Sequence, residues 1–280
     1  MPAPIRVGAV IYDPRVVVIW DIIKDFFQAQ DCPMDYVFYS NYELLVETLL
    51  AGHVQIAWNS PLAWIDAQRQ TGGTCRAVAM RDTDRDRVTH LIVRQDSALA
   101  TLADLRGKTV ATGAHDSPQA TLLPLHLLHT AGLEPARDFT VRRFDLMVGK
   151  HGDHIGGEQA ALRSLQAGES DAAAVLDLNW TRWTGDGTAS PHELRVLATT
   201  HPFDHCNFTV LAGFPPDDLD RWLGALFSMT YDNPAHREMM DLEGLHAWLP
   251  GRTSGYADLT AAVAEQHFFA DRPAPAASTG

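Results

Sequence analysis

The stretch that decides the fold is YELLVETLLAGHVQIAWNSPLAWI, residues 42–65. Its first half repeats apolar residues at three- and four-residue steps, which is typical of an amphipathic helix, and Gly52 stands where helices commonly end in a left-handed residue. A run typical of a buried strand follows at residues 54–58, and Ser60-Pro61 can cap and open a second helix. Helix, strand and helix in succession predict an α/β unit.

The same alternation extends in both directions from this stretch. Further apolar runs rich in β-branched residues lie at residues 5–11, 35–39, 77–80, 90–94, 109–112, 140–144, 172–176 and 195–199. Helical patterns separate them at residues 17–28, 61–70, 119–131 and 158–167. Strands that alternate with helices of this length predict an α/β fold with largely parallel sheets.

Composition excludes several classes of protein. The chain has 280 residues, 46% of them hydrophobic, and 22 Lys and Arg against 35 Asp and Glu give a formal net charge of −13. This profile indicates a globular protein of one large domain or two lobes, and it argues against non-specific binding to nucleic acid. No apolar run is long enough for membrane insertion. Thirteen histidines are the unusual feature.

Three cysteines, Cys32, Cys75 and Cys206, are widely spaced and form no CxxC motif, so no disulfide framework is indicated. The first residues, MPAPIRVGAVIY, lack the basic segment and long apolar run of a secretory signal. We therefore expect cytoplasmic localisation.

Four blocks together resemble a known family. They are residues 42–65, residues 91–128 with the element D-L-R-G-K-T-V-A, residues 165–177, and residues 233–259 with the late tyrosine Tyr256. With these blocks the sequence resembles the phosphate/phosphite/phosphonate-type periplasmic substrate-binding proteins, over residues 5–268.

The resemblance implies an α/β, two-lobed fold of the type II periplasmic-binding-protein class, with the ligand in a cleft between the lobes that closes by a hinge motion. Lobe one would comprise residues 1–93 and 206–280, and lobe two residues 99–199. Residues 94–98 and 200–205 would be the hinge crossings. The tail at residues 272–280, rich in Pro, Ala and Ser, is expected to be disordered. Independently of the resemblance, open α/β sheets bind ligands at the carboxyl ends of their strands.

Candidate ligand-binding residues follow the predicted strands, open the predicted helices or lie in the second crossing: Tyr12, Trp58, Asn59, Ser60, His115, Asp116, Ser117, Gln119, Asp177 and His205. Each also has a structural explanation, such as a helix cap at Asn59 or Ser60, a turn at Tyr12, or a structural histidine at His205. The loop at residues 115–119 has fewer hydroxyls than the resemblance implies. A carboxylate ligand is therefore as plausible as a phosphonate.

Part of the histidine surplus falls on loops with an acidic neighbour. His115, Asp116, His151, His154 and His205 are candidate ligands of a divalent metal, iron or zinc, because imidazole and carboxylate suit both. His115 and His205 are also the candidate catalytic groups. The alternative for the His-x-x-His at 151–154 is a solvated loop, since its spacing is not a recognised zinc pattern.

Two functions remain open at this point. In the first, the protein binds a small polar or anionic metabolite, a phosphonate-like oxyanion or a carboxylate, by closure of the cleft. In the second, it is a cytoplasmic enzyme on the same fold, a His/Asp metal-dependent oxygenase or lyase of the non-haem-iron type acting on a small metabolite. The sequence contains no nucleophile elbow, phosphate-binding P-loop, dinucleotide fingerprint or H-E-x-x-H motif.

Overall fold

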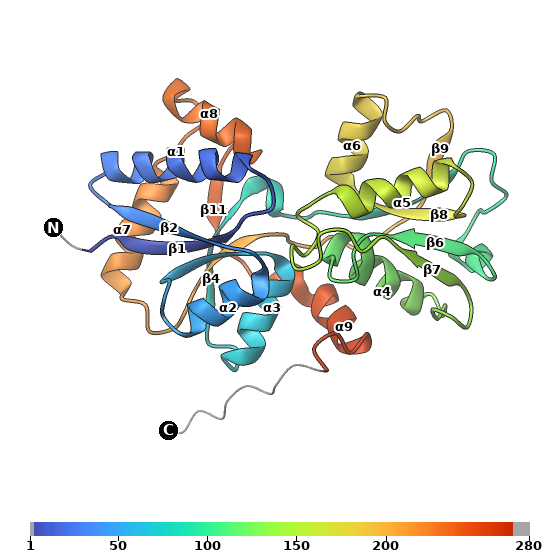
Figure 1. The fold of residues 1–280 in the computed structure, drawn as a ribbon, viewed down its shortest axis with the longest axis horizontal. Helices are drawn as coiled ribbons and strands as arrows, with labels where there is room; N and C mark the ends of the chain where they lie inside the picture. The colour runs from blue at the N-terminus through green and yellow to red at the C-terminus, as the bar shows by residue number, and fades with distance from the viewer. Residues whose placement is uncertain (1–2, 271–280) are drawn as a thin grey trace. The chain divides into compact units, whose positions relative to one another are not determined.

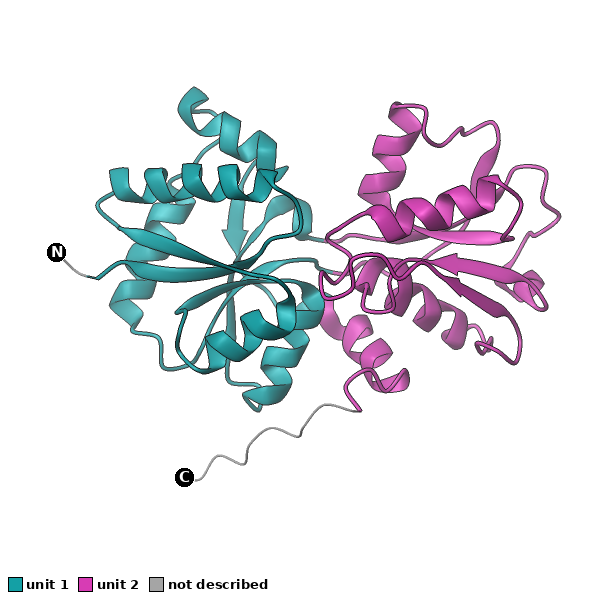
Figure 2. Ribbon diagram, viewed as in Figure 1, with its two compact units in different colours: residues 1–85, 204–255, 272–280 teal, residues 86–203, 256–271 magenta. Residues whose placement is uncertain are grey.

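A computed structural model describes residues 3–270, and these form two compact units. Unit 1 comprises residues 3–85 and 204–255, and unit 2 comprises residues 86–203 and 256–270 (Figure 2). The predicted disordered tail at residues 272–280 lies outside the described residues. Each unit is an α/β structure around one sheet.

Unit 1 has a six-stranded sheet in the order β11-β4-β10-β3-β1-β2. Figure 1 shows β1 and β2 side by side in this sheet. Its strands are β1 (Ile5–Val10), β2 (Met34–Tyr39), β3 (Ile56–Asn59), β4 (Arg76–Arg81), β10 (Asn207–Val210) and β11 (Trp248–Pro250). Its helices are α1 (Arg15–Ala29), α2 (Tyr42–Leu50), α3 (Pro61–Gln70), α7 (Pro216–Phe227) and α8 (Pro234–Glu243). β1 is parallel to β2 and β3, whereas β10 runs antiparallel between β3 and β4.

The stretch at residues 42–65 folds as its pattern predicts. Asn41 caps α2 by accepting a hydrogen bond from the Leu44 N–H (2.8 Å), and Gly52 after the helix has φ +72°. All four residues of β3 are buried, and the Ser60 hydroxyl caps α3 by accepting from the Ala63 N–H (3.1 Å). The predicted helix–strand–helix unit is confirmed.

Unit 2 has a five-stranded sheet in the order β7-β6-β8-β5-β9. Its strands are β5 (Thr89–Arg94), β6 (Thr109–Thr112), β7 (Thr140–Arg143), β8 (Ala172–Leu176) and β9 (Leu194–Thr199). Its helices are α4 (Leu123–Thr130), α5 (Gly156–Gln166), α6 (Asp177–Gly185) and α9 (Ala257–Glu265). β6 is parallel to β7 and β8, and β5 is antiparallel to β8 and β9.

The division differs from the expected lobes at two places. Residues 94–98 do not cross between units, because β5 is a central strand of unit 2. α9 belongs to unit 2 rather than to lobe one, since the Gln266 amide donates to the Leu122 carbonyl (2.9 Å) and His126 contacts Glu265 (2.7 Å). The chain therefore changes unit after residues 85, 203 and 255.

In residues 3–270, no helix has both the length and the apolar character that crossing a membrane requires.

Glycine 8 permits close packing at the centre of unit 1, which predicts a specific cost for Gly8→Ala. A Cβ there would lie 2.4 Å from Leu45 Cδ1, so the larger residue overpacks the core and lowers the free energy of unfolding by about 1–3 kcal/mol. The control Gly224→Ala, in α7, meets no atom within 4 Å and should raise stability by about 0.5–1 kcal/mol. Urea unfolding followed by circular dichroism measures both. Equal stability of Gly8→Ala and the natural chain would contradict the packing.

Candidate functional site

Three segments emerge at one edge of the unit 2 sheet. β6 lies between β7 and β8 and is parallel to both, so the segments that follow these three strands emerge on the same side. These segments are residues 113–117 after β6, residues 144–155 after β7, and the start of α6 at Asp177 after β8. The predicted ligand loop at residues 115–119 therefore lies at a carboxyl edge.

Two of these segments are joined by specific hydrogen bonds, and we call residues 113–119 and 145–153 the edge loops. The backbone N–H of His115 donates to Asp145 Oδ1 (2.7 Å), and the His115 ring nitrogen Nδ1 lies 3.0 Å from the same oxygen. The Gly149 N–H donates to Asp116 Oδ2 at 2.6 Å. The Gln119 side-chain amide donates to the Gly152 carbonyl at 3.0 Å. The edge loops therefore form one hydrogen-bonded structure.

Glycine 152 allows the edge loops to approach this closely. Its φ is +83°, and a Cβ there would lie 2.3 Å from Ser117 Oγ and 2.5 Å from Gln119 Nε2. The backbone conformation and the lack of space both require glycine.

The edge loops bury polar side chains whose acceptor capacity is not filled. Asp116 and Gln119 are each 2% exposed, and Asp116 Oδ1 and Gln119 Oε1 have no hydrogen-bond partner among the described residues. The orientation of the Gln119 amide is fixed, because its nitrogen must face the Gly152 carbonyl. Unfilled buried acceptors are costly, so they indicate a place where water or a ligand donates.

The edge loop at residues 145–153 contains a buried, positively charged side chain, that of Lys150. Lys150 is 8% exposed, burial lowers the pKa of its ammonium group, and the Asp153 carboxylate opposes that shift. His151, next to it, is 2% exposed and has a positive φ of 50°. His154 Nδ1 accepts the Gly156 N–H (3.2 Å) at the start of α5, which gives His154 a structural role.

Asp177 is held by backbone and ion-pair contacts, but its Oδ1 is buried without a hydrogen-bond partner among the described residues. The Asp177 N–H donates to the Val88 carbonyl (2.9 Å), and its carboxylate pairs with Arg87 (3.4 Å). Glu158, in the first turn of α5, accepts from the Leu176 N–H (2.7 Å) and from the Asn179 amide (3.0 Å).

Unit 1 presents a comparable edge. Asn59 is fully buried at the end of β3, and its amide donates to Thr209 Oγ1 of β10 (3.0 Å), which in turn donates to Asn207 Oδ1 (2.7 Å). Asn59 Oδ1 has no partner among residues 3–270. Trp58 packs on Phe208, with ring centroids 4.6 Å apart, and so belongs to the core. Tyr12, after β1, is partly buried against that core.

The two edges share one local design. Asn59-Ser60-Pro61 opens α3, and Asp116-Ser117-Pro118 opens the π-helical turn that leads into α4. In both, the serine hydroxyl accepts the N–H three residues on at 3.1 Å, and the preceding side chain has a buried oxygen without a partner among described residues. Helix starts of this kind present N–H groups to an anion.

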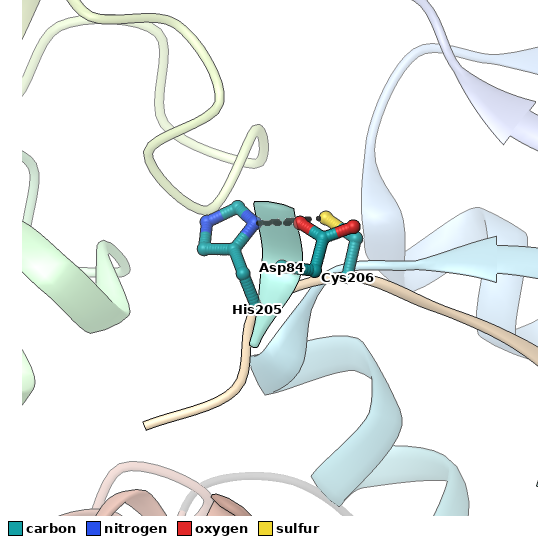
Figure 3. A group of neighbouring side chains, drawn as sticks. All are labelled: Asp84, His205 and Cys206. Atoms are coloured by element: carbon teal, nitrogen blue, oxygen red, sulfur yellow. Dashed lines mark hydrogen bonds and ion pairs between the residues drawn. The ribbon is translucent and has the colours of Figure 1, made fainter. Parts of the chain in front are cut away.

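The second crossing segment places His205 in unit 1, beside Asp84 and Cys206 (Figure 3). His205 Nδ1 lies 3.1 Å from Cys206 Sγ and 3.5 Å from Asp84 Oδ1. The Arg81 guanidinium donates to both Asp84 oxygens, at 2.6 and 2.7 Å. The sequence analysis did not single out Asp84 and Arg81, which lie between the predicted strands at residues 77–80 and 90–94. It also missed Asp145 and Lys150 of the second edge loop.

The predicted metal ligands do not come together. In the part of the chain that the structure describes, acidic, histidine and cysteine side chains gather in a group of three at ligand distance only at Asp84, His205 and Cys206. Of the five predicted ligands, that group contains His205 alone. His115 and Asp116 are instead bonded to Asp145 and Gly149, and the other two are His151 and His154.

Comparison with known structures identifies the fold. PhnD1 of Prochlorococcus marinus in complex with methylphosphonate has a TM-score of 0.69 at 17% identity, with 94% of this chain and 98% of that chain covered. A Xanthomonas citri protein bound to ATP gives 0.74 at 17% identity, with 95% and 99% covered. The sulphonate-binding protein SsuA of Escherichia coli gives 0.63 at 18% identity, with 99% and 95% covered. The predicted periplasmic-binding-protein-like fold is confirmed.

The family follows from the sequence itself. Residues 13–256 match the family described as the phosphonate periplasmic substrate-binding protein of ABC transporters, and the chain belongs to this family. A stretch of 29 residues, 10% of this chain, is also 62% identical to an uncharacterized protein of Haemophilus influenzae. That stretch spans 41% of the Haemophilus protein, so the match covers less than half the length of this curated relative.

The close approach of the edge loops predicts that Gly152→Ala is damaging. The added Cβ meets Ser117 and Gln119 at a positive φ, and we expect a loss of about 2–4 kcal/mol in the free energy of unfolding. The matched control is Gly187→Ala, also at a positive φ (+82°) but with nothing within 4 Å, which should cost only about 1 kcal/mol. Chemical denaturation compares the two, and equal losses would show that Gly152 is needed for its backbone conformation alone.

Proposed function

We propose that this protein binds a small metabolite that carries an oxyanion, a phosphonate-like group or a carboxylate, together with hydrogen-bond donors. The observation that carries the proposal is the pair of buried Ser-Pro helix starts at Ser60 and Ser117, one at the carboxyl edge of each sheet. N–H groups at such helix starts favour bound anions.

The donor requirement rests on the unfilled acceptors beside each helix start. Asn59 Oδ1 in unit 1 and Asp116 Oδ1 and Gln119 Oε1 in unit 2 are buried oxygens that only accept hydrogen bonds. A bare oxyanion leaves them unfilled and is repelled by Asp116. An ammonium, amide or hydroxyl group on the ligand satisfies them.

Family membership supports the binding of a small molecule. Among the similar structures, PhnD1 is described with methylphosphonate and the Xanthomonas protein with ATP, and both ligands carry phosphorus oxyanions. Enclosure of the ligand by hinge closure of two lobes stays a prediction, as does cytoplasmic localisation.

The alternative function, a His/Asp metal-dependent enzyme, has less support. It requires metal ligands drawn from His115, Asp116, His151, His154 and His205. Within the described residues, the group of three at ligand distance contains only His205 of these five. We therefore do not put this enzyme forward.

Titration calorimetry with matched probes tests the proposal. We expect (aminomethyl)phosphonate to bind at least tenfold more tightly than methylphosphonate, because its ammonium group donates to Asp116 and Gln119. Ser117→Ala should weaken both probes about tenfold by removing a hydroxyl from the helix start, and Asp116→Asn should remove the preference for the amino compound. Glycine against acetate repeats the comparison for carboxylates.

Two variants serve as controls. Ser228→Ala removes an exposed hydroxyl at the end of α7 and should leave affinity unchanged. His115→Ala removes a ring that is held by Asp145 at the rim of the edge loops, and it should weaken binding less than Ser117→Ala. Unchanged affinity in Ser60→Ala and Ser117→Ala alike would refute the placement of the ligand.

A further inference from the structure

The cluster of Asp84, His205 and Cys206 in unit 1 combines three different metal-ligating groups. Asp84 ends the turn that follows β4, and His205 and Cys206 immediately precede β10. The His205 N–H donates to the Asp84 carbonyl at 2.7 Å, so the backbone itself holds the two segments together. Figure 3 shows the three side chains pointing toward one another.

The distances suit a single small ion. The three potential ligand atoms lie within 4.8 Å of one another, with His205 Nδ1 3.1 Å from Cys206 Sγ and 3.5 Å from Asp84 Oδ1. In a tetrahedral zinc site, with bonds of about 2.0–2.3 Å, ligand atoms are about 3.3–3.6 Å apart. Small side-chain movements therefore convert the observed contacts into a coordination shell.

We propose that Asp84, His205 and Cys206 bind one zinc-like divalent cation, with the fourth position left to water or a ligand oxygen. Thiolate, imidazole and carboxylate together are a donor set typical of zinc, and the sulfur selects against magnesium and calcium. This site lies within unit 1, shares no residue with the edge loops and uses only one of the predicted metal ligands.

The surrounding charges favour a cation. Arg81 donates hydrogen bonds to both oxygens of Asp84, and its positive charge stabilises the ionised form of that carboxylate. Arg81 also pairs with the Glu243 carboxylate at 3.3 Å and donates to the Glu243 carbonyl at 3.0 Å. Two carboxylates thus face one guanidinium, and a cysteine thiolate with a divalent ion brings the group to neutrality.

Arg81 also orients the carboxylate. Its Nε and Nη2 atoms donate to Asp84 Oδ2 and Oδ1, which fixes the plane of the carboxylate, and its guanidinium lies over the Trp58 ring at 5.2 Å. A carboxylate oxygen has two lone pairs, so Oδ1 can bind the ion and still accept from Arg81. Such outer contacts commonly position metal ligands.

Titration of the tag-free full chain with Zn²⁺ and Co²⁺ tests the proposal. We expect one Zn²⁺ per chain in competition with a chromophoric chelator, and thiolate-to-cobalt charge-transfer absorption with Co²⁺. Cys206→Ser and His205→Gln should each weaken Zn²⁺ binding at least 100-fold. The matched controls, Cys75→Ser at another buried cysteine and His53→Gln at an exposed histidine, should bind as the natural chain does.

Three results would overturn the site. They are binding well below one ion per chain, unchanged affinity in both Cys206→Ser and His205→Gln, and a cobalt spectrum without thiolate absorption. The spectrum is read on the natural chain, so the test holds even if Cys206→Ser does not fold. Failure of this site leaves the oxyanion proposal untouched, because the calorimetric probes contain no metal.

Discussion

Parallel strand pairing, of β3 with β1 in unit 1 and of β6 with β7 and β8 in unit 2, is the constraint on which the candidate contacts depend. It delivers the helix starts to one edge of each sheet. In both units an antiparallel strand then begins at that edge and supports the helix start. Thr209 of β10 accepts from Asn59, and Thr89 of β5 donates to the Gln119 carbonyl at 2.7 Å. The same solution therefore appears twice in one chain.

Buried ion pairs fix the edge of unit 1. Arg252 donates to both oxygens of the fully buried Asp204 at 2.6 Å, as Arg81 does to Asp84. Burying a carboxylate is unfavourable unless a partner of good geometry compensates, and loss of either arginine leaves a buried, unpaired charge. These pairs fall on the segments beside the unit boundaries, at residues 84 and 204. The two ion pairs therefore anchor the chain in unit 1 next to the points where it changes unit, after residues 85 and 203.

Local signals made the helix starts predictable, whereas long-range contacts were not. The caps at Ser60 and Ser117 follow from a serine before a proline at the end of an apolar run, all within a few residues. The pairing of Asp84 with His205 joins segments more than a hundred residues apart, which the pairing of β4 with β10 and the hydrogen bond from the His205 N–H to the Asp84 carbonyl bring together. The predicted set of metal ligands was wrong for the same reason, because residue type alone does not show which side chains lie close together in the fold. One local feature was also not predicted. The helix expected at residues 119–131 begins with a π-helical turn, in which the Leu122 N–H donates to the Ser117 carbonyl.

The two helix starts differ in the charge of one neighbouring side chain, and that difference decides which ligand group each helix start suits. Asn59 offers a neutral amide oxygen beside Ser60, whereas Asp116 offers a carboxylate oxygen beside Ser117. An oxyanion near Ser60 meets helix N–H groups with no opposing charge from its neighbour. An oxyanion near Ser117 meets the same N–H groups but is repelled by Asp116, and at short range a full charge outweighs the partial charge of a helix start. The helix start in unit 1 therefore suits a bare oxyanion, whereas the helix start in unit 2 suits an oxyanion on a molecule that also carries a hydrogen-bond donor for Asp116.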